Sequence, residues 1–171
     1  MLATNPAPIG PLVDPAALAS FRGGPFDAAV TNAAAQSIRS ECGWHIAPSV
    51  ETTVAVRTGG ADSVLLPSLH VTAVASVTDR RSGAQVTGWE AYDNGILERP
   101  GGFPDAVEIT FTHGFETCPE DLLGIIAERA VAQSAGRVKS ESLAGRSVQL
   151  EGGDNPTTQT TINAYRLTWG A

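Results

Sequence analysis

Two pairs of cysteine and histidine residues are the first candidates for chemistry in this sequence. Cys42 and His45 lie in SECGWHIAPSVE, and His113 and Cys118 lie in FTHGFETCPED. These residue types and the short spacing within each pair suit a tetrahedral zinc site. However, each pair is mixed, whereas zinc fingers usually place two cysteines in one half and two histidines in the other. A chain of 171 residues is also long enough to fold around an apolar core without a metal. We therefore expect no metal ligands here.

Cys118 also has features of a cysteine nucleophile. It stands at the start of a predicted helix, where a thiol pKa is lowered, with His113 or His45 as a base and Asp121 as the orienting group. Against this, no glycine-rich oxyanion loop accompanies it, and neither ECGWH nor ETCPE matches the sequences around known catalytic cysteines. A free cysteine is more often a small buried hydrophobe. The sequence thus favours a protein that is not an enzyme, with no catalytic residue and no cofactor. A zinc-binding or cysteine-hydrolase domain stays as the alternative.

A structural interpretation explains both pairs, because each lies where a predicted helix meets a predicted strand. A glycine after a helix allows the left-handed turn that ends it, and the aromatic residue that follows buries apolar area. The second pair makes the corresponding turn from the last strand into the second helix. The sequence therefore predicts a structural junction made of Cys42, Gly43, Trp44, His45, His113 and Gly114.

The elements that must position this junction follow from the apolar periodicity. Residues 25–42 and 119–135 show helical spacing, and the stretch between about 50 and 112 alternates with a period of two. Asp93-Asn94-Gly95 is a strong signal for a tight hairpin. We expect the two helices to pack on each other and the strands to form an antiparallel sheet between them.

The predicted fold class is α+β, a helical bundle with an inserted antiparallel β-meander and a C-terminal extension. Residues 1–24 are expected to form an N-terminal arm, with a short helix beginning at Asp14 and Pro15. Residues 25–139 form the α+β domain. Residues 140–171 are predicted to be a flexible segment, with DNPTTQTT as a loop, followed by a C-terminal anchor in INAYRLTWGA.

The composition excludes several classes of protein. The net charge is −7, and there is no basic tract, which disfavours a module that wraps nucleic acid by neutralising phosphates. The first residues lack the pattern of a signal peptide, and no apolar run is long enough for a membrane span. We expect a soluble protein made in a reducing cytoplasm, without a membrane partner. A monomeric β-rich binding module is a further alternative.

The order of several motifs resembles that of the head-to-tail connector, or adaptor, proteins of tailed phages. The stretches are IRSECGWHIAPSVE, LLPSLHVTAVASVTD, Trp89 to Arg99, VEITFTHGFETCPEDLLGII and a closing YRL. The likeness runs from about Pro25 to Leu167 and is greatest to adaptors of siphophages that infect actinobacteria. The Pro- and Ala-rich residues 1–20 depart from the pattern, so no role is carried onto them.

The resemblance implies a virion protein of the neck that is present in the host cytoplasm during assembly. Such adaptors form a ring beneath the portal, with copies matching its twelvefold symmetry, and extend the channel through which DNA passes without sequence-specific binding. They join the portal protein to the next neck or tail-completion protein. In this family the C-terminal segment grips the portal, which in this sequence implies an anchor made of Ile162, Tyr165, Arg166, Leu167 and Trp169.

Overall fold

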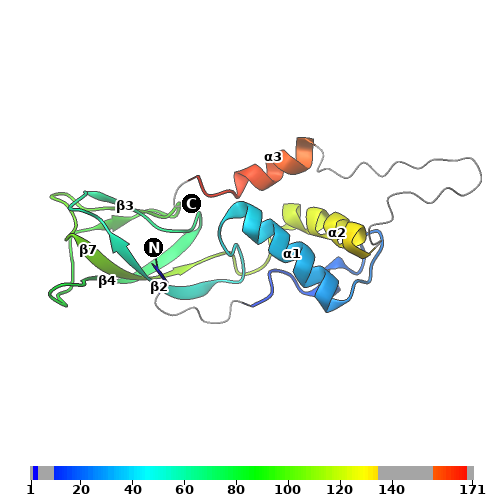
Figure 1. Ribbon diagram of the computed structural model, residues 1–171, viewed down its shortest axis with the longest axis horizontal. Helices are drawn as coiled ribbons and strands as arrows, with labels where there is room; N and C mark the ends of the chain where they lie inside the picture. The colour runs from blue at the N-terminus through cyan, green and yellow to red at the C-terminus, as the bar shows by residue number, and fades with distance from the viewer. Residues whose placement is uncertain (1, 4–9, 135–155, 169–171) are drawn as a thin grey trace, which may run out of the picture.

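The computed structural model describes residues 2–3, 10–134 and 156–168. The molecule is elongated, with a half made of helices at one end and a half made of strands at the other (Figure 1). We call them the helical half and the sheet half. The prediction of a mixed α+β fold is confirmed. None of the helices in the described part of the chain has the length and apolar character needed to cross a membrane.

The helical half contains a short 3-10 helix η1 (Pro15–Leu18) and the α-helices α1 (Ala28–Cys42), α2 (Glu120–Ser134) and α3 (Pro156–Ala164). The prediction that α1 and α2 pack on each other is confirmed. The α1 helix begins at Ala28 rather than at residue 25, because the Asp27 side chain accepts a hydrogen bond from the Val30 amide and caps the helix. It ends at Gly43, whose φ of 82° is left-handed.

Residues 12–18 and 156–164 complete the helical core, which differs from the expected arm and loop. Leu12, Val13 and Leu18 are buried in this core, although residues 1–24 were expected to form an arm. Residues 156–164 were expected to begin as a loop but form α3, which lies against α1 and α2 (Figure 1). The segment is rich in threonine and is a poor helix former on its own, so tertiary packing overrides its propensity.

The strands form two antiparallel sheets. The first has the order β1 (Leu2–Ala3), β2 (Val50–Arg57), β7 (Ala106–His113) and β4 (Val71–Asp79); the second has the order β3 (Ser63–Leu65), β6 (Ile96–Glu98) and β5 (Glu90–Ala91). Antiparallel pairing is as predicted, but the meander is wrong, because β2 and β4 both pair with β7 and neither pairs with β3, the strand between them in sequence. The hairpin predicted at residues 93–95 joins β5 to β6.

β7 lies between β2 and β4 in the first sheet, and its alternating sequence buries one face of the strand. Val107, Ile109 and Phe111 are wholly buried on one face, and the residues between them are half-buried on the other. The buried face packs against apolar residues of the second sheet and its loops, including Leu66 and Leu97. This core is separate from the core of the helices. In the described part of the chain, each half is therefore built on its own apolar core.

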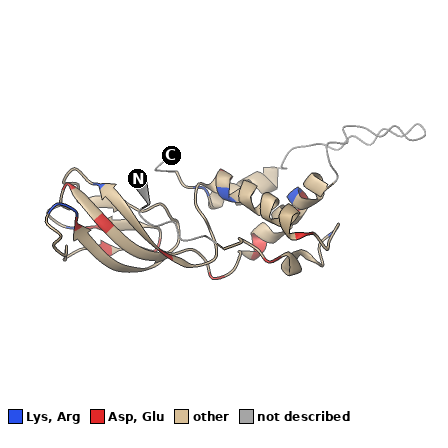
Figure 2. Cartoon of the chain, turned by 60° about the horizontal axis from the view of Figure 1, so that its bottom comes forward, with Lys and Arg blue, Asp and Glu red and all other residues tan. Residues whose placement is uncertain are grey.

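Charged residues are sparse over the described chain, and its arginines are scattered over both halves without a continuous basic band (Figure 2). Arg80 and Arg81 are exposed at the tip that follows β4, where the Asp79 carboxylate accepts hydrogen bonds from the Arg81 amide and the Ser82 hydroxyl.

Candidate functional site

Two histidines lie at the centre of the junction between the halves. The rings of His45 and His113 meet edge to face, with centroids 4.3 Å apart. His45 Nε2 donates to the Pro48 carbonyl at 2.8 Å, and His113 Nε2 lies 3.3 Å from Thr52 Oγ1. His113 Nδ1 is buried and has no hydrogen-bond partner among the described residues. Burial lowers the pKa of His113 to about 3 and also lowers the pKa of His45, so both rings are neutral at pH 7.

Position 114, beside this histidine pair, requires a glycine. Its φ is 96°, and a Cβ atom there would lie 2.5 Å from His45 Nε2 and 2.9 Å from the Pro48 carbonyl oxygen. The Gly114 amide donates to the His70 carbonyl at 2.8 Å, and the next amide, of Phe115, donates to the Ile46 carbonyl at 2.7 Å. The chain leaving β7 is thus fixed against the chain leaving α1, and only glycine fits at the closest approach.

The cysteines do not have the environment of a metal site or a nucleophile. Cys42 is wholly buried, and burial raises its pKa to about 11; Cys118 is half-buried, and burial raises its pKa to about 12. A reactive cysteine needs the opposite shift, because the thiolate is the nucleophile. Asp121, the suggested orienting group, accepts a hydrogen bond from the Tyr165 hydroxyl instead. Within residues 2–3, 10–134 and 156–168, no three His, Cys, Asp or Glu side chains are grouped to hold a metal ion.

Aromatic rings connect the histidine pair to the helical half. Phe115 stacks on His70 with centroids 4.2 Å apart and contacts Trp44 and Tyr165 at 6.3 and 6.1 Å. The Trp44 indole donates to the Tyr165 carbonyl at 2.7 Å. Trp44 therefore links the end of α1 to the segment after α3. All six residues of the predicted junction lie in this region.

The described residues of the expected C-terminal anchor lie against the helical half of their own subunit. Ile162 is wholly buried in the helical core. The Leu167 amide donates to the Cys42 carbonyl at 2.8 Å, and Tyr165 is half-buried against the same core. Arg166 keeps a partly exposed side chain, while Trp169 lies outside the described residues. Four of the five proposed anchor residues thus lie in α3 or in the segment that follows it, residues 165–168, which we call the C-terminal strap. A short apolar segment is stabilised by covering the nearest apolar surface.

Two charged residues near the end of α1 organise the junction and were not anticipated from the sequence. Glu41 accepts from Arg129 at 2.8 Å, from Arg166 at 2.9 Å and from Gln159 at 3.1 Å, so it joins α1 to α2 and to the C-terminal strap. The hydrogen bond from Arg129 and the neighbouring cations hold the pKa of Glu41 below its usual range. The available signal was that α1 has only two charged residues in 15, Arg39 and Glu41.

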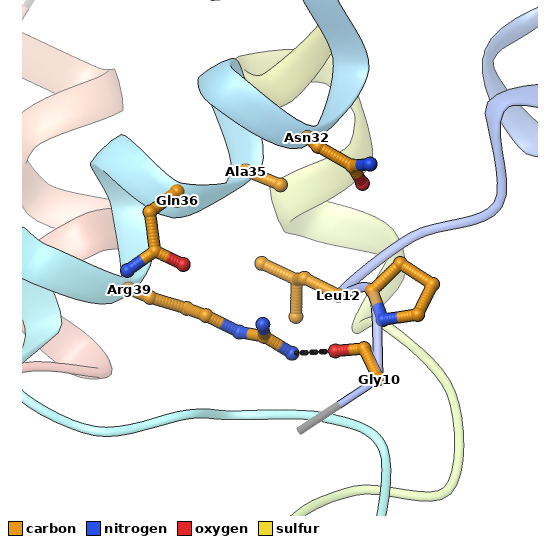
Figure 3. Close-up of a pocket in the computed structure, with 7 residues that line it drawn as sticks. Gly10, Leu12, Asn32, Ala35, Gln36 and Arg39 are labelled. Atoms are coloured by element: carbon orange, nitrogen blue, oxygen red, sulfur yellow. Dashed lines mark hydrogen bonds between the residues drawn. The ribbon is translucent and has the colours of Figure 1, made fainter. Parts of the chain in front are cut away.

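Arg39 fixes the N-terminal segment to the junction. Its Nε donates to the His45 carbonyl at 2.7 Å, and Nη2 donates to the Gly10 carbonyl at 2.9 Å and to the Ala47 carbonyl. Figure 3 shows the guanidinium reaching from α1 to Gly10 across an open surface hollow of about 370 Å³. The hollow is lined by Gly10, Pro11, Leu12, Asn32, Ala35, Gln36 and Arg39. Because the guanidinium bonds to backbone carbonyls, Arg39 acts as a structural tie.

Comparison with known proteins finds the same fold in two neck assemblies. One is a chain in the neck of an empty gene transfer agent (GTA) particle computed with C6 symmetry, with a TM-score of 0.66 and 17% identity. The other is a chain in the neck of a native GTA particle computed with C12 symmetry, with a TM-score of 0.62 and 21% identity. In each comparison the likeness covers 100% of this chain and 98% of the other. No protein-family model and no curated protein sequence matches the chain.

Proposed function

We propose that this chain is a structural protein of the neck of a tailed phage or phage-like particle, where it connects the head to the tail. The observation that carries the proposal is the extent of the structural likeness, which covers 100% of this chain and 98% of each neck chain. A likeness limited to a small sheet or a helix pair would support only a common substructure. The sequence motifs point in the same direction and favour a siphophage of actinobacteria.

The proposed assembly is a ring of copies beneath the portal, with twelve copies matching the portal symmetry. The C6 and C12 symmetries of the two GTA necks support this arrangement. A closed ring needs two different faces of one subunit that fit each other. The elongated subunit, with dissimilar halves, provides such different faces (Figure 1).

The charge of the protein suits a channel that DNA passes through without binding. The net charge is −7, and the described residues show no continuous basic band (Figure 2). DNA-binding surfaces neutralise phosphates with clustered Lys and Arg, and a surface without them does not retain DNA. The ring thus extends the DNA channel, joins the portal protein to the next neck or tail-completion protein, and needs no catalytic residue. The protein is made in the host cytoplasm and remains in the virion neck.

Contact with the portal is proposed at the end of the C-terminal strap. Arg166 has a side chain that is 42% exposed, and Leu167 is half-buried beside it. Trp169 follows two residues later and completes the proposed contact. Ile162 is not part of it, because that side chain lies wholly within the helical core.

Co-assembly with the portal protein of the same particle tests the proposal. The two purified proteins should form one complex whose mass corresponds to twelve copies of each. Arg166→Ala combined with Trp169→Ala should weaken the complex, while Arg80→Ala, at the exposed tip after β4, should leave it intact. The proposal is overturned if no complex forms and if particles lacking this protein still carry tails.

A further inference from the structure

The outer side of β4 has a short stretch of unpaired backbone. One side of β4 pairs with β7 along its length. On the other side, the Val71 amide donates to the Asp93 carbonyl, and the Val77 carbonyl accepts from the Val86 amide. Between these two points, residues 72–76 have no outer backbone partner in the described part of the chain. The result is a slot of five residues, closed at both ends, which we call the β4 slot.

The sequence of the β4 slot lacks the charged residues and proline that often protect an exposed edge. Residues 71–78 read VTAVASVT, without a charge or a proline, and the first charged residue is Asp79. Soluble proteins commonly place lysine or proline on free edge strands, because unpaired amides and carbonyls recruit another chain. Two register shifts lie in this stretch, and Thr72, Ala73 and Ala75 are exposed. An uncharged free edge is expected where a further strand pairs in the assembled state.

The opposite edge of the same sheet is β1. Its two residues pair antiparallel with Ala55 and Val54 of β2, and among the described strands, in the order β1-β2-β7-β4, none pairs with the other side of β1. β1 thus lies beside β2, at the end of the strand order that is away from β4. β1 has two residues, so it is short enough to fit within the β4 slot of residues 72–76.

The directions of the strands decide how the two edges fit. Each strand is antiparallel to its neighbour, so β1 and β4, at the ends of a sheet of four strands, run in opposite directions. Rotation about a ring axis parallel to the strands keeps every strand direction, so β4 of one copy meets β1 of the next in antiparallel orientation. Without β1 the sheet would have three strands, and the same contact would be parallel, which is the slightly less stable pairing.

We propose that β4 of each subunit pairs with β1 of the next copy, so that the sheets of neighbouring subunits join edge to edge around the ring. The partner is a second copy of this chain, and the segment that fills the β4 slot is the N-terminal strand Leu2–Ala3. The contact joins two different edges, which is the heterologous type that a cyclic ring requires. This inference rests on the proposed ring of copies.

Disulfide trapping tests the contact between copies. In a Cys118→Ser background, Ala3→Cys is combined with Ala73→Cys or with Ala75→Cys, and the full chain is oxidised alone and with the portal protein. Cys42 stays in place because it is wholly buried. We expect neither single variant to cross-link by itself, a mixture of the two to give dimers, and the double variant to give a ladder of covalent oligomers.

A charge in the slot provides an independent test. Ala73→Lys should abolish the ring while leaving the melting temperature of the monomer unchanged, because the residue is exposed in a single subunit. The matched control is Ala91→Lys, an equally exposed alanine on β5 at the edge of the other sheet, and this variant should still form the ring. Deletion of residues 2–9 should have the same effect as Ala73→Lys.

The outcomes separate this inference from the proposed function. Cross-linking of the Ala73→Cys or Ala75→Cys variant with itself would show that β4 pairs with another β4, and would overturn the inference. The inference would also be overturned if the Ala73→Lys variant still formed the ring and the double cysteine variants gave no ladder of covalent oligomers. That result would leave the proposed function standing. If the unmodified chain forms no ring, alone or with the portal protein, the proposed function fails and this inference fails with it.

Discussion

The helical half and the sheet half are built from the chain in different ways. The strands β2 to β7 come from one continuous stretch, residues 50–113, with large branched and aromatic side chains in their core. The helical core combines segments from the beginning, middle and end of the chain, and alanines make up much of its α1 and α2 surfaces. The sheet core can therefore form from one stretch of sequence, whereas the helical core is complete only when residues 12–18 and α3 are also in place.

Because the two halves are built differently, the junction has to close the helical half as well as attach the sheet half. Arg39 ties Gly10 to the end of α1, and Glu41 ties Arg166 to the same turn. Closure of the helical half and attachment of the sheet half thus occur at one place. We expect the two halves to respond separately to core substitutions and together to changes at the junction.

The largest expected effect is that of a large-to-small change in the sheet core. Phe111→Ala removes a wholly buried ring and should lower the free energy of unfolding by about 3–5 kcal/mol. Hydrogen exchange should show lost amide protection across residues 50–113, with protection retained in α1 and α2. Thr112→Ala, next in the strand and half-buried, should change stability by less than about 1 kcal/mol. Equal loss of protection in both halves would show that they unfold as one unit.

In the helical half, a large-to-small change at Ile162 tests whether α3 belongs to the core. Ile162→Ala should cost about 2–5 kcal/mol, because the side chain is wholly buried between α3 and the helix pair. Cys42 lies under α3, with Sγ 3.8 Å from the Ile162 carbonyl oxygen, so a thiol reagent should label it faster in this variant. Asn163→Ala, at an exposed neighbouring position, is the control. Unchanged stability and labelling would mean that α3 is not docked in solution.

A glycine at the junction tests the closest contact between the halves. Gly114→Ala should cost about 2–3 kcal/mol, since the new Cβ meets His45 and Pro48 and the φ of 96° is unfavourable for alanine. Gly101→Ala is a matched control, because its φ is 88° and nothing lies within 4 Å of the added Cβ. Denaturant unfolding should show a clearly smaller loss for Gly101→Ala. Equal losses would indicate that only backbone strain matters and that the contact between the halves is loose.

The buried histidine pair predicts a smaller, pH-dependent effect. Burial lowers the pKa of His113 to about 3 from its ordinary 6.5, so the unfolded chain binds a proton at a pH where the folded chain does not. Stability is therefore fully present above pH 6.5 and falls as the pH drops toward 3, by about 1–2 kcal/mol at pH 5. In His113→Gln the decline between pH 7 and 5 should be shallower. A parallel decline in both proteins would assign the pH dependence to other groups.

The sequence was most informative where structure is set locally. The alternating pattern of β7, the hairpin turn at Asp93-Asn94-Gly95 and the glycine that ends α1 all have local causes, and each was predicted. The strand order was not, because β2 and β4 pair with a strand that comes much later in the chain. Nothing in the local pattern distinguishes this order from a meander.

The candidate site shows the same limit. The junction residues were recognisable because glycine and aromatic types follow a helix end, a combination with a local structural meaning. Glu41 was not recognisable, since its partners Arg129, Gln159 and Arg166 all lie far along the chain. The helix at Pro156–Ala164 was missed for the same reason, because the contacts that stabilise it are made with α1 and α2.

Cryo-microscopy of the neck of the intact particle tests the central claim most directly. The account predicts a ring of twelve copies of this chain between the portal and the next neck protein, with the C-terminal strap toward the portal and β4 of each copy beside β1 of the next. It is contradicted if the ring below the portal is built from another protein, or if this chain is absent from purified particles.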